Sequence, residues 1–309
     1  MKLILNLSEG FSQKTALALG MFDGLHLGHR AVLAAAQCLA DENALLPGAF
    51  SFSSHPLSLL DDGGEKKLLL PAAEKAWALK KAGMGLAVLP RFSEELKNIA
   101  AEDFIALLCE NYGAKAFAAG EDHRFGRGGK GDAALLRRLS GQMGFALQIV
   151  PELSRGGERL SSSAIRGLLQ GGDLERANAL LGQPYALWGR VVPGQRLART
   201  LGFPTANLRL RDDKLLPKFG VYAGFAVLGR ARFPAVCNVG LRPSVPSAPP
   251  ATEAHLIGFS GDAYGSCVKL ELLAFLRPEL KFDGLEALQA QVLRDLAAAR
   301  AFLAEKAQK

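Results

Sequence analysis

In the first half of the chain, short apolar runs alternate with segments of helical periodicity, and this alternation limits the folds that the chain can form. The expected strands are residues 16–20, 49–52, 86–89, 116–119 and 146–150. The expected helices between them are residues 30–40, 72–81, 102–112 and 133–139. Strands separated by helices predict a doubly wound parallel sheet with helices on both faces. Ligands bind such sheets at the carboxyl ends of the strands, so we expect a site in the loops after the first, second and fourth strands.

After Pro184 the pattern changes to strands with no helix between them. Two helices come before this point, one at residues 162–170 and one that Asp173 caps and Gly182 ends. The strand-like runs that follow are residues 185–192, 220–228, 235–240, 253–259 and 267–275, and the next helix is 284–306. This order predicts an antiparallel barrel or sandwich with a C-terminal helix. We therefore expect two domains, residues 1–183 and residues 184–309.

The composition is typical of a protein that binds anions, but it does not identify the ligand. A chain of 309 residues has room for two cores, and its net charge of +7 suits the handling of nucleotides, phosphorylated metabolites or nucleic acid. Aromatic platforms and a recognition helix are lacking, so we expect no nucleic-acid partner. The four cysteines form no CxxC pair, and no run is long and apolar enough for a secretory signal or a membrane span. We expect a cytoplasmic protein, with a monomer as one open choice of oligomeric state.

A glycine-rich turn that carries two histidines, Gly20–His29, joins the first expected strand to the first helix. Glycine allows the backbone to turn tightly and to approach a ligand, and the N–H groups that open a helix bind anions. His26 and His29 flank Gly28, so both imidazoles can face one phosphate and neutralise charge as a triphosphate is cut. The bare spacing also suits a metal pair or a chance pair. Its position between strand and helix favours the phosphate interpretation.

Two further segments suit the same pocket. Residues 161–166 offer serine hydroxyls at a helix start and Arg166 one turn later, which suits phosphate binding or an ordinary cap with a solvated arginine. Residues 120–132 are rich in glycine and basic residues, which favours a lid over an anionic substrate; a solvated loop is the alternative. Four of the five histidines are expected in loops at this edge of the sheet, namely His26, His29, His55 and His123.

The second half carries a separate candidate site at residues 199–207. If the chain is extended there, Thr205 and Asn207 project from one face, and their side-chain oxygens are hard ligands suited to Mg²⁺. A polar strand edge is the alternative. Glu253 lies in an otherwise apolar strand and suits a general base for a substrate hydroxyl, or else a solvent-facing position. No GxxxxGK[ST] motif is present, so a kinase site would not be of the P-loop type.

Taken in order, these segments resemble the bacterial bifunctional riboflavin kinase/FMN adenylyltransferase (FAD synthetase) family over essentially the whole chain. The matching segments of the first half are residues 20–29, 51–56, 122–126 and 161–166. Those of the second half are residues 200–207, 220–223, 238–243, 253, 262–265 and 275–279. The resemblance implies a nucleotidyltransferase-like α/β domain and a riboflavin kinase β-barrel. It also implies that ATP phosphorylates riboflavin to FMN and that a second ATP adenylylates FMN to FAD with release of pyrophosphate.

The resemblance further implies roles for single residues, with ATP as co-substrate and Mg²⁺ as cofactor. The implied catalytic residues are Glu253, His29 and Arg166. The implied ATP-binding residues are Gly20, Phe22, Asp23, Gly24, His26, Gly28, His29, Ser162, Ser163, Arg166, Gly202, Thr205 and Asn207, of which Thr205 and Asn207 also hold the metal. The implied flavin-binding residues are His55, Asp122, Phe125, Arg127, Arg242, Arg277 and Phe282.

The sequence departs from the family pattern at several positions. His123 stands where the family has an aromatic residue and Ala164 where arginine is common. Ser51 and Ser54 fall in the segment where the family usually has Thr-Phe-x-Pro-His-Pro, and Ala198 stands where glycine is usual. His123 and Ala164 fall on the adenylyltransferase side. Two other functions therefore stay open: a riboflavin kinase with a weakened adenylyltransferase site, and a flavin-binding regulator without catalysis. The retained Glu253 argues against the regulator, because a binding module needs no base.

Overall fold

The computed structural model describes residues 1–56, 59, 66–194, 203–241 and 250–307. The chain divides into two compact units, Met1–Ser162 and Ser163–Lys309, and each is described by itself. This division assigns the two helices before Pro184 to the second unit. The domain boundary between residues 183 and 184 stays a prediction.

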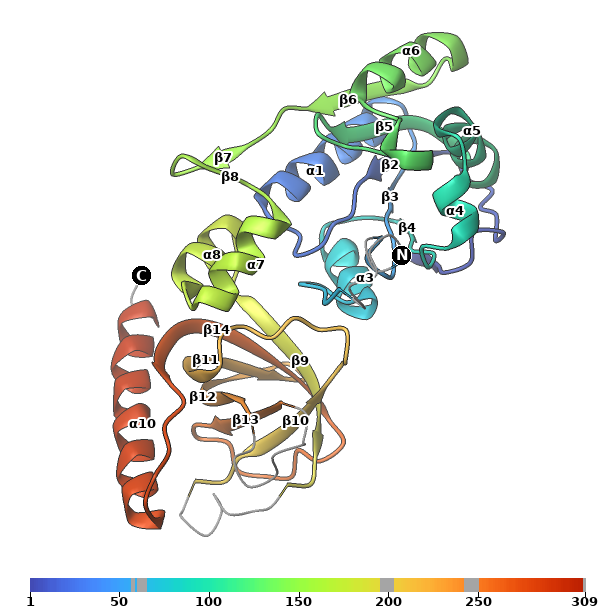
Figure 1. Cartoon of the computed structure of the whole chain (residues 1–309). Helices are drawn as coiled ribbons and strands as arrows, with labels where there is room; N and C mark the ends of the chain where they lie inside the picture. The colour runs from blue at the N-terminus through green and yellow to red at the C-terminus, as the bar shows by residue number, and fades with distance from the viewer. Residues whose placement is uncertain (57–58, 60–65, 195–202, 242–249, 308–309) are drawn as a thin grey trace. The chain divides into compact units, whose positions relative to one another are not determined.

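A six-stranded sheet forms the centre of the first unit, and all of its strand pairs are parallel (Figure 1). In spatial order the strands are β1 (Lys2–Ile4), β4 (Leu86–Val88), β3 (Leu46–Phe50), β2 (Thr15–Leu19), β5 (Ala114–Gly120) and β6 (Ala146–Val150). The helical segments are α1 (Leu27–Glu42), α3 (Ala72–Lys81), α4 (Glu94–Asn98), α5 (Ala101–Tyr112), η1 (Arg127–Gly129) and α6 (Ala133–Met143). A small hairpin of β7 (Ser154–Arg155) and β8 (Glu158–Arg159) follows β6. The predicted parallel α/β sheet is confirmed.

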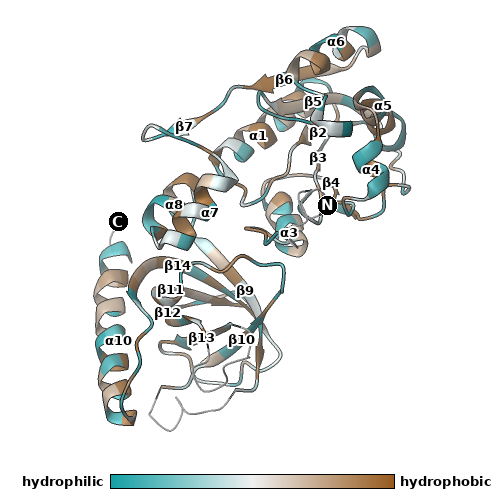
Figure 2. Ribbon diagram, in the orientation of Figure 1, coloured by the Kyte–Doolittle hydropathy of each residue, from teal (hydrophilic) through white to brown (hydrophobic). Residues whose placement is uncertain are grey.

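Each face of this sheet is covered by its own apolar core. Alternate residues of β2 point to opposite faces: Ala16 packs into the core formed with α1 and α3, and Leu17 into the core formed with α5 and α6. Figure 2 shows both hydrophobic and hydrophilic colouring on α5 and α6, as expected for helices that pack one side on a sheet. Burial on both faces explains why residues 16–19 of β2 form a continuous apolar run.

The strand order places a topological switch point beside β2. The chain passes from β2 to β3 on one side, whereas β5 lies against β2 on the other. The loops that leave the carboxyl ends of β2 and β5 therefore diverge and open a crevice, where open α/β sheets bind their ligands. The fold thus puts the loop Gly20–His26 opposite the loop that starts at Glu121.

The second unit contains a closed antiparallel barrel, which decides between the barrel and the sandwich. Around the barrel the strands are β10 (Ala206–Leu210), β13 (Ala251–Leu256), β12 (Ala231–Gly240), β11 (Gly220–Leu228), β14 (Cys267–Pro278) and β9 (Tyr185–Val192). The helices of this unit are α7 (Ser162–Gly171), whose first residue belongs to the first unit, α8 (Leu174–Leu181) and α10 (Leu285–Ala307). As expected, Asp173 caps α8, and Gly182 ends it in the left-handed conformation.

A buried ion pair fastens α10 to the barrel. The Arg277 guanidinium on β14 donates to the Asp295 carboxylate through Nε at 2.9 Å and through Nη2 at 2.7 Å. Gln291 donates to the same carboxylate at 2.8 Å, and Asp295 is only 6% exposed. The guanidinium carbon also lies 6.0 Å from the centre of the Phe282 ring. The predicted flavin contacts Arg277 and Phe282 therefore have structural contacts of their own, and their flavin role stays a prediction.

We expect Arg277→Met to destabilise the second unit by about 3 kcal/mol, because it leaves the buried Asp295 carboxylate without its counter-charge. Urea unfolding followed by circular dichroism measures this change. Arg300→Met, which alters an exposed arginine on the same helix, serves as the matched control and should change stability little. An unchanged urea midpoint for Arg277→Met would show that the ion pair does not hold α10.

Candidate functional site

The loop between β2 and α1 has a fixed conformation that depends on one buried ring. Phe22 is fully buried at φ 47°, and Leu25 and Gly24 also have positive φ values, 48° and 88°. A Cβ atom on Gly20 would lie 2.9 Å from the Phe22 ring, so glycine is needed there. The Phe22 ring packs edge-on against His29, with 5.4 Å between ring centres. The loop therefore determines where the second histidine lies.

The two histidines of this loop interact directly at the start of α1. His26 is the N-cap residue, and the His29 backbone N–H donates to its Nδ1 at 3.3 Å. Because Nδ1 accepts this bond, the proton of the neutral His26 ring is on Nε2. The two rings stack with their centres 3.6 Å apart. Among the described residues, the buried Nδ1 of His29 has no hydrogen-bond partner.

The histidines of this pocket are held uncharged. Burial lowers the pKa of His26 from 6.5 to about 4, against an opposing effect of Asp122 and Asp23. Burial also lowers the pKa of His29 well below 6.5, and the neighbouring His26, Lys75 and His123 lower it further. The pKa of His123 falls to about 4 for the same reason of burial. Neutral imidazoles can still donate a hydrogen bond to a phosphate oxygen.

A cavity of about 260 Å³ lies at the switch point of the sheet. Of the residues predicted from the sequence, it is lined by Gly20, Phe22, His26, Gly28, His29, Asp122 and Ser162. Its other walls come from the β5–α6 loop and from residues 150–161. The structure thus brings together the HxGH motif (His26–His29), the loop after β5 and Ser162, as expected from the sequence.

Asp23 lies behind this cavity and holds the loop in place. Its carboxylate is fully buried and accepts a hydrogen bond from the Leu70 N–H at 2.8 Å. Its backbone carbonyl accepts one from the Ser162 hydroxyl at 2.8 Å. Gly24 follows at positive φ. These contacts tie the β2–α1 loop to two distant segments of the chain, so the predicted ATP contacts of Asp23 and Gly24 are not needed to explain these residues.

Sequence reasoning missed Arg159, a residue of the short strand β8. Its guanidinium lines the cavity and forms ion pairs with Asp122 at 2.8 Å and with Glu152 at 2.6 Å. All three side chains are substantially exposed, so the pairs are weak and can exchange for a ligand phosphate. A two-residue strand after a Gly-Gly turn gives no periodic signal, which is why the sequence did not reveal it.

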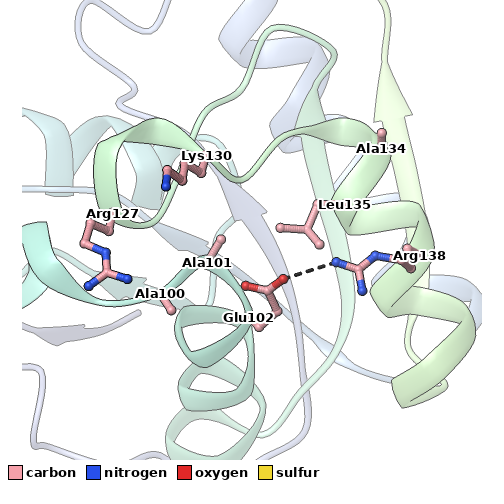
Figure 3. A pocket seen from close by; sticks show the side chains of 8 residues that line it. All are labelled: Ala100, Ala101, Glu102, Arg127, Lys130, Ala134, Leu135 and Arg138. Carbon is pink, nitrogen blue, oxygen red and sulfur yellow. Dashed lines mark hydrogen bonds and ion pairs between the residues drawn. The ribbon is translucent and has the colours of Figure 1, made fainter.

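The other predicted flavin contacts of the first unit lie elsewhere. Phe125 is 7% exposed and packs into the core beside Phe104, with its ring stacked on His123. Arg127 lines a separate hollow of about 510 Å³ between α5, η1 and α6, where Figure 3 shows it with Lys130. His55 is partly buried in the segment after β3.

Two further predicted residues belong to α7. Ser163 and Arg166 lie in the part of α7 that the second unit contains, and Arg166 is 9% exposed. The predicted residues Gly202 and Arg242 lie outside the described residues.

In the barrel, strand pairing brings the second set of predicted residues together. Asn207 on β10 lies directly opposite Glu253 on β13, and Glu253 lies directly opposite Asn238 on β12. Opposite residues have Cβ atoms about 5 Å apart, so the three side chains form one row across three strands. Asn207 is 7% exposed, and a Cβ on Gly194 would overlap its amide. Thr205 comes immediately before β10.

His255 holds the segment before β10 against β13. Its Nδ1 lies 2.9 Å from the Pro204 carbonyl oxygen, and its ring meets the Phe203 ring edge-on at 6.1 Å. Glu253 and His255 alternate with the buried Thr252 and Ala254, so both face away from the barrel interior. Neither His255 nor Asn238 was expected from the sequence as a site residue. The alternation of residues along β13 could have indicated that His255 lies on the same face of the strand as Glu253.

Comparison with known proteins matches both halves of the chain. The pattern of the FAD synthetase family matches residues 8–164, and that of the riboflavin kinase family matches residues 181–303. A bifunctional riboflavin kinase/FMN adenylyltransferase from Escherichia coli is 37% identical over 299 residues, which cover 96% of this chain and 95% of the relative. The protein of that name from Bacillus subtilis is 34% identical over 287 residues, which cover 91% and 90%.

A solved structure shares the whole fold. The crystal structure described as a macrolide-efflux protein from Streptococcus pneumoniae superposes with a TM-score of 0.86 at 29% identity, covering 97% of this chain and 98% of that one. Within the described ranges of the present chain, no helix is long and apolar enough to cross a membrane.

We expect the first unit to lose stability as the pH falls from about 6.5 towards 4, because its buried histidines take up protons on unfolding that they do not bind when folded. His123→Phe should flatten this dependence. With a folded pKa of about 4 against 6.5 unfolded, His123 alone contributes up to about 3 kcal/mol of the loss. Urea unfolding at about pH 7 and about pH 4.5 tests this. Equal losses for the variant and the unaltered protein would contradict it.

Proposed function

The chain belongs to the bifunctional riboflavin kinase/FMN adenylyltransferase family, and we propose that its two reactions are divided between its two units. The barrel phosphorylates riboflavin with ATP to give FMN, and the parallel-sheet unit adenylylates FMN with a second ATP to give FAD. One observation carries this division: the riboflavin kinase and FAD synthetase patterns match separate segments of the chain. FMN, the product of the barrel, is then the substrate of the first unit.

For the kinase reaction, we assign the base to Glu253. Its carboxylate takes the proton of the ribityl 5′-hydroxyl as that oxygen attacks the γ-phosphorus of ATP, and ADP leaves. The cross-strand neighbours Asn207 and Asn238 support this assignment, because they flank Glu253 with polar groups that can orient the carboxylate and the hydroxyl. The Glu253 side chain faces away from the barrel interior. A substrate can therefore reach it from outside the barrel.

The residues beside Glu253 fit Mg²⁺. Thr205 offers a hydroxyl and Asn207 an amide oxygen, and these hard donors match the preference of this ion. Gly194 leaves the Asn207 amide the space it occupies, since a Cβ there would overlap it. Bound there, Mg²⁺ would neutralise charge on the ATP phosphates. The contact between His255 and the Pro204 carbonyl keeps Thr205 and Asn207 in register with Glu253.

For the adenylyl transfer, an oxygen of the FMN phosphate attacks the α-phosphorus of ATP, and the bond to the departing pyrophosphate breaks. We propose that His26 donates to a phosphate through Nε2–H and that His29 faces the same anion. Arg166 stays a prediction as a third catalytic residue. The N–H groups that open α1 add to this binding. The step needs positioning and electrostatic stabilisation only, with no covalent enzyme intermediate.

We propose Asp122 and Arg159 as the residues of the first unit that meet FMN. Both line the cavity beside the histidines, and their exposed ion pair can open as Arg159 turns to the FMN phosphate. His55, Phe125 and Arg127 stay predictions as flavin contacts.

We also place the domain boundary at residues 183/184 and the enzyme in the cytoplasm. The two family matches leave residues 165–180 between them, which puts α8 next to the boundary. The four cysteines are free thiols, as proteins of reducing compartments have.

Separate substitutions should silence the two steps one at a time. With riboflavin, ATP and Mg²⁺, His29→Ala should accumulate FMN and form FAD about 100-fold more slowly, because the triphosphate loses one donor. Asn207→Ala should slow FMN formation by a similar factor but still convert added FMN to FAD. Chromatography of the three flavins measures both rates, and Asn98→Ala, an exposed change on α4, is the control.

The unaltered protein distinguishes the remaining alternatives in the same assay. FMN that accumulates without FAD would indicate a kinase alone, and the absence of both products would indicate a regulator. If each variant slowed the same step, the division of reactions between the units would be wrong.

We expect Glu253→Gln to abolish riboflavin phosphorylation while riboflavin still binds, because the amide keeps the shape of the side chain and cannot take a proton. Fluorescence titration measures riboflavin binding, and the flavin assay measures turnover. Turnover close to that of the unaltered enzyme would exclude Glu253 as the base.

A further inference from the structure

Lys75 is a lysine on α3 whose whole side chain is buried. Its ammonium donates to the Met21 carbonyl at 2.7 Å, to the Phe52 carbonyl at 2.8 Å and to the Ser51 hydroxyl at 3.2 Å. The Ser51 hydroxyl also lies 2.7 Å from the Met21 carbonyl, to which it donates. One ammonium thus joins the loop after β2 to the segment after β3, at the carboxyl edge of the sheet.

Burial of this charge opposes folding, so a packing role alone is a poor explanation for it. The three groups that it contacts are uncharged, and burial lowers the pKa of Lys75 to about 8, with Asp23 acting in the opposite direction. A neutral donor could satisfy the same three acceptors at a smaller desolvation cost. What distinguishes Lys75 from a neutral donor is its positive charge, which offsets the buried Asp23 carboxylate and also acts on His29.

Two connections lead from Lys75 to His29. The first is mechanical: Lys75 holds the Met21 carbonyl, the next residue is Phe22 at positive φ, and the Phe22 ring packs edge-on against His29. The second is electrostatic, because the positive charge of Lys75 lowers the pKa of His29. Met21 and Phe22 both line the cavity, whereas Lys75 does not, so it acts through them.

We propose that Lys75 is a positioning residue of the adenylyl-transfer site: it fixes the β2–α1 loop, and its positive charge favours the uncharged imidazole of His29. This inference rests on the role that His29 has in the proposed function. A neutral, aligned ring donates a hydrogen bond to the triphosphate, and the buried ammonium behind the loop adds a positive field where pyrophosphate departs.

Several groups contribute to the charge balance around this pair. Asp23 acts on Lys75 from the β2–α1 loop, and His26 and His123 act on His29 from the N-cap of α1 and from the β5–α6 loop. Asp122 acts on His26 and His123. Lys75 is the fully buried cation of this group, so its removal should change the pKa of His29 in a definite direction, upward.

The first test compares Lys75→Met with Lys80→Met, the same change at an exposed position of the same helix. We expect Lys75→Met to lower kcat for FAD formation about 100-fold, as a small displacement of a catalytic group does. The KM for ATP should change less than kcat, and riboflavin phosphorylation should be unaffected. Lys80→Met should leave both reactions unchanged.

The second test measures the titration of His29 directly by NMR of its ring carbons. The spectrum is simple because the chain has only five histidines. In Lys75→Met, the pKa of His29 should rise, because a neighbouring positive charge has gone. In the unaltered protein, the His29 signal should show a second step at the pH at which the Lys75 side chain loses its proton. A residue that only filled space would produce neither effect.

The outcomes separate this inference from the function on which it rests. If His29→Ala still forms FAD, the assignment of His29 fails and the inference fails with it. If His29→Ala is inactive but Lys75→Met retains FAD formation within about threefold, the inference alone is overturned. If Lys75→Met does not fold by circular dichroism, the unaltered protein decides: a His29 signal without a step at the Lys75 titration overturns the proposal.

Discussion

The burial of Phe22 is the contact on which the first site depends. Its backbone adopts positive φ, which costs an ordinary residue about 1 kcal/mol or more, and its ring is fully buried. Gly20 leaves room for that ring, and the resulting turn lets α1 begin with His26 as its cap. The stacked pair of His26 and His29 is therefore a consequence of how the chain enters α1. A side chain at residue 20 would displace both rings without touching either.

In the barrel, the register of the paired strands determines which side chains of the second site lie together. Asn207 and Glu253 meet because β10 and β13 pair in one register, and a slip by one residue would turn Glu253 towards the interior. The contact from His255 to the Pro204 carbonyl opposes such a slip. The two sites thus reach precision differently. The first has a loop closed over a buried ring, and the second has side chains aligned by hydrogen-bonded strands.

Elements with a clear local periodicity were predicted from the sequence. Features that depend on contacts between distant parts of the chain were missed. The segments 72–81, 146–150 and 220–228 have the same bounds in the structure, since each is a clear amphipathic or apolar run. Strand β1 was missed because three residues become a strand only through pairing with β4. The HxGH motif was found because its parts are adjacent in sequence. Lys75 looked like any lysine of an amphipathic helix, and only packing against two loops buries it.

Uncharged histidines suit an enzyme that must both bind a triphosphate and release pyrophosphate. Charged imidazoles would bind the phosphates of substrate and product alike, and binding that is equal in the ground and transition states does not raise kcat. Neutral donors at fixed positions form stronger hydrogen bonds as charge develops on the departing phosphate, so they stabilise the transition state most. In the proposed mechanism, the desolvation that lowers the pKa of His26 and His29 therefore serves the chemistry as well as the fold. The ion pairs of Arg159 are exposed and therefore weak, which suits the proposed role of Arg159 in meeting FMN.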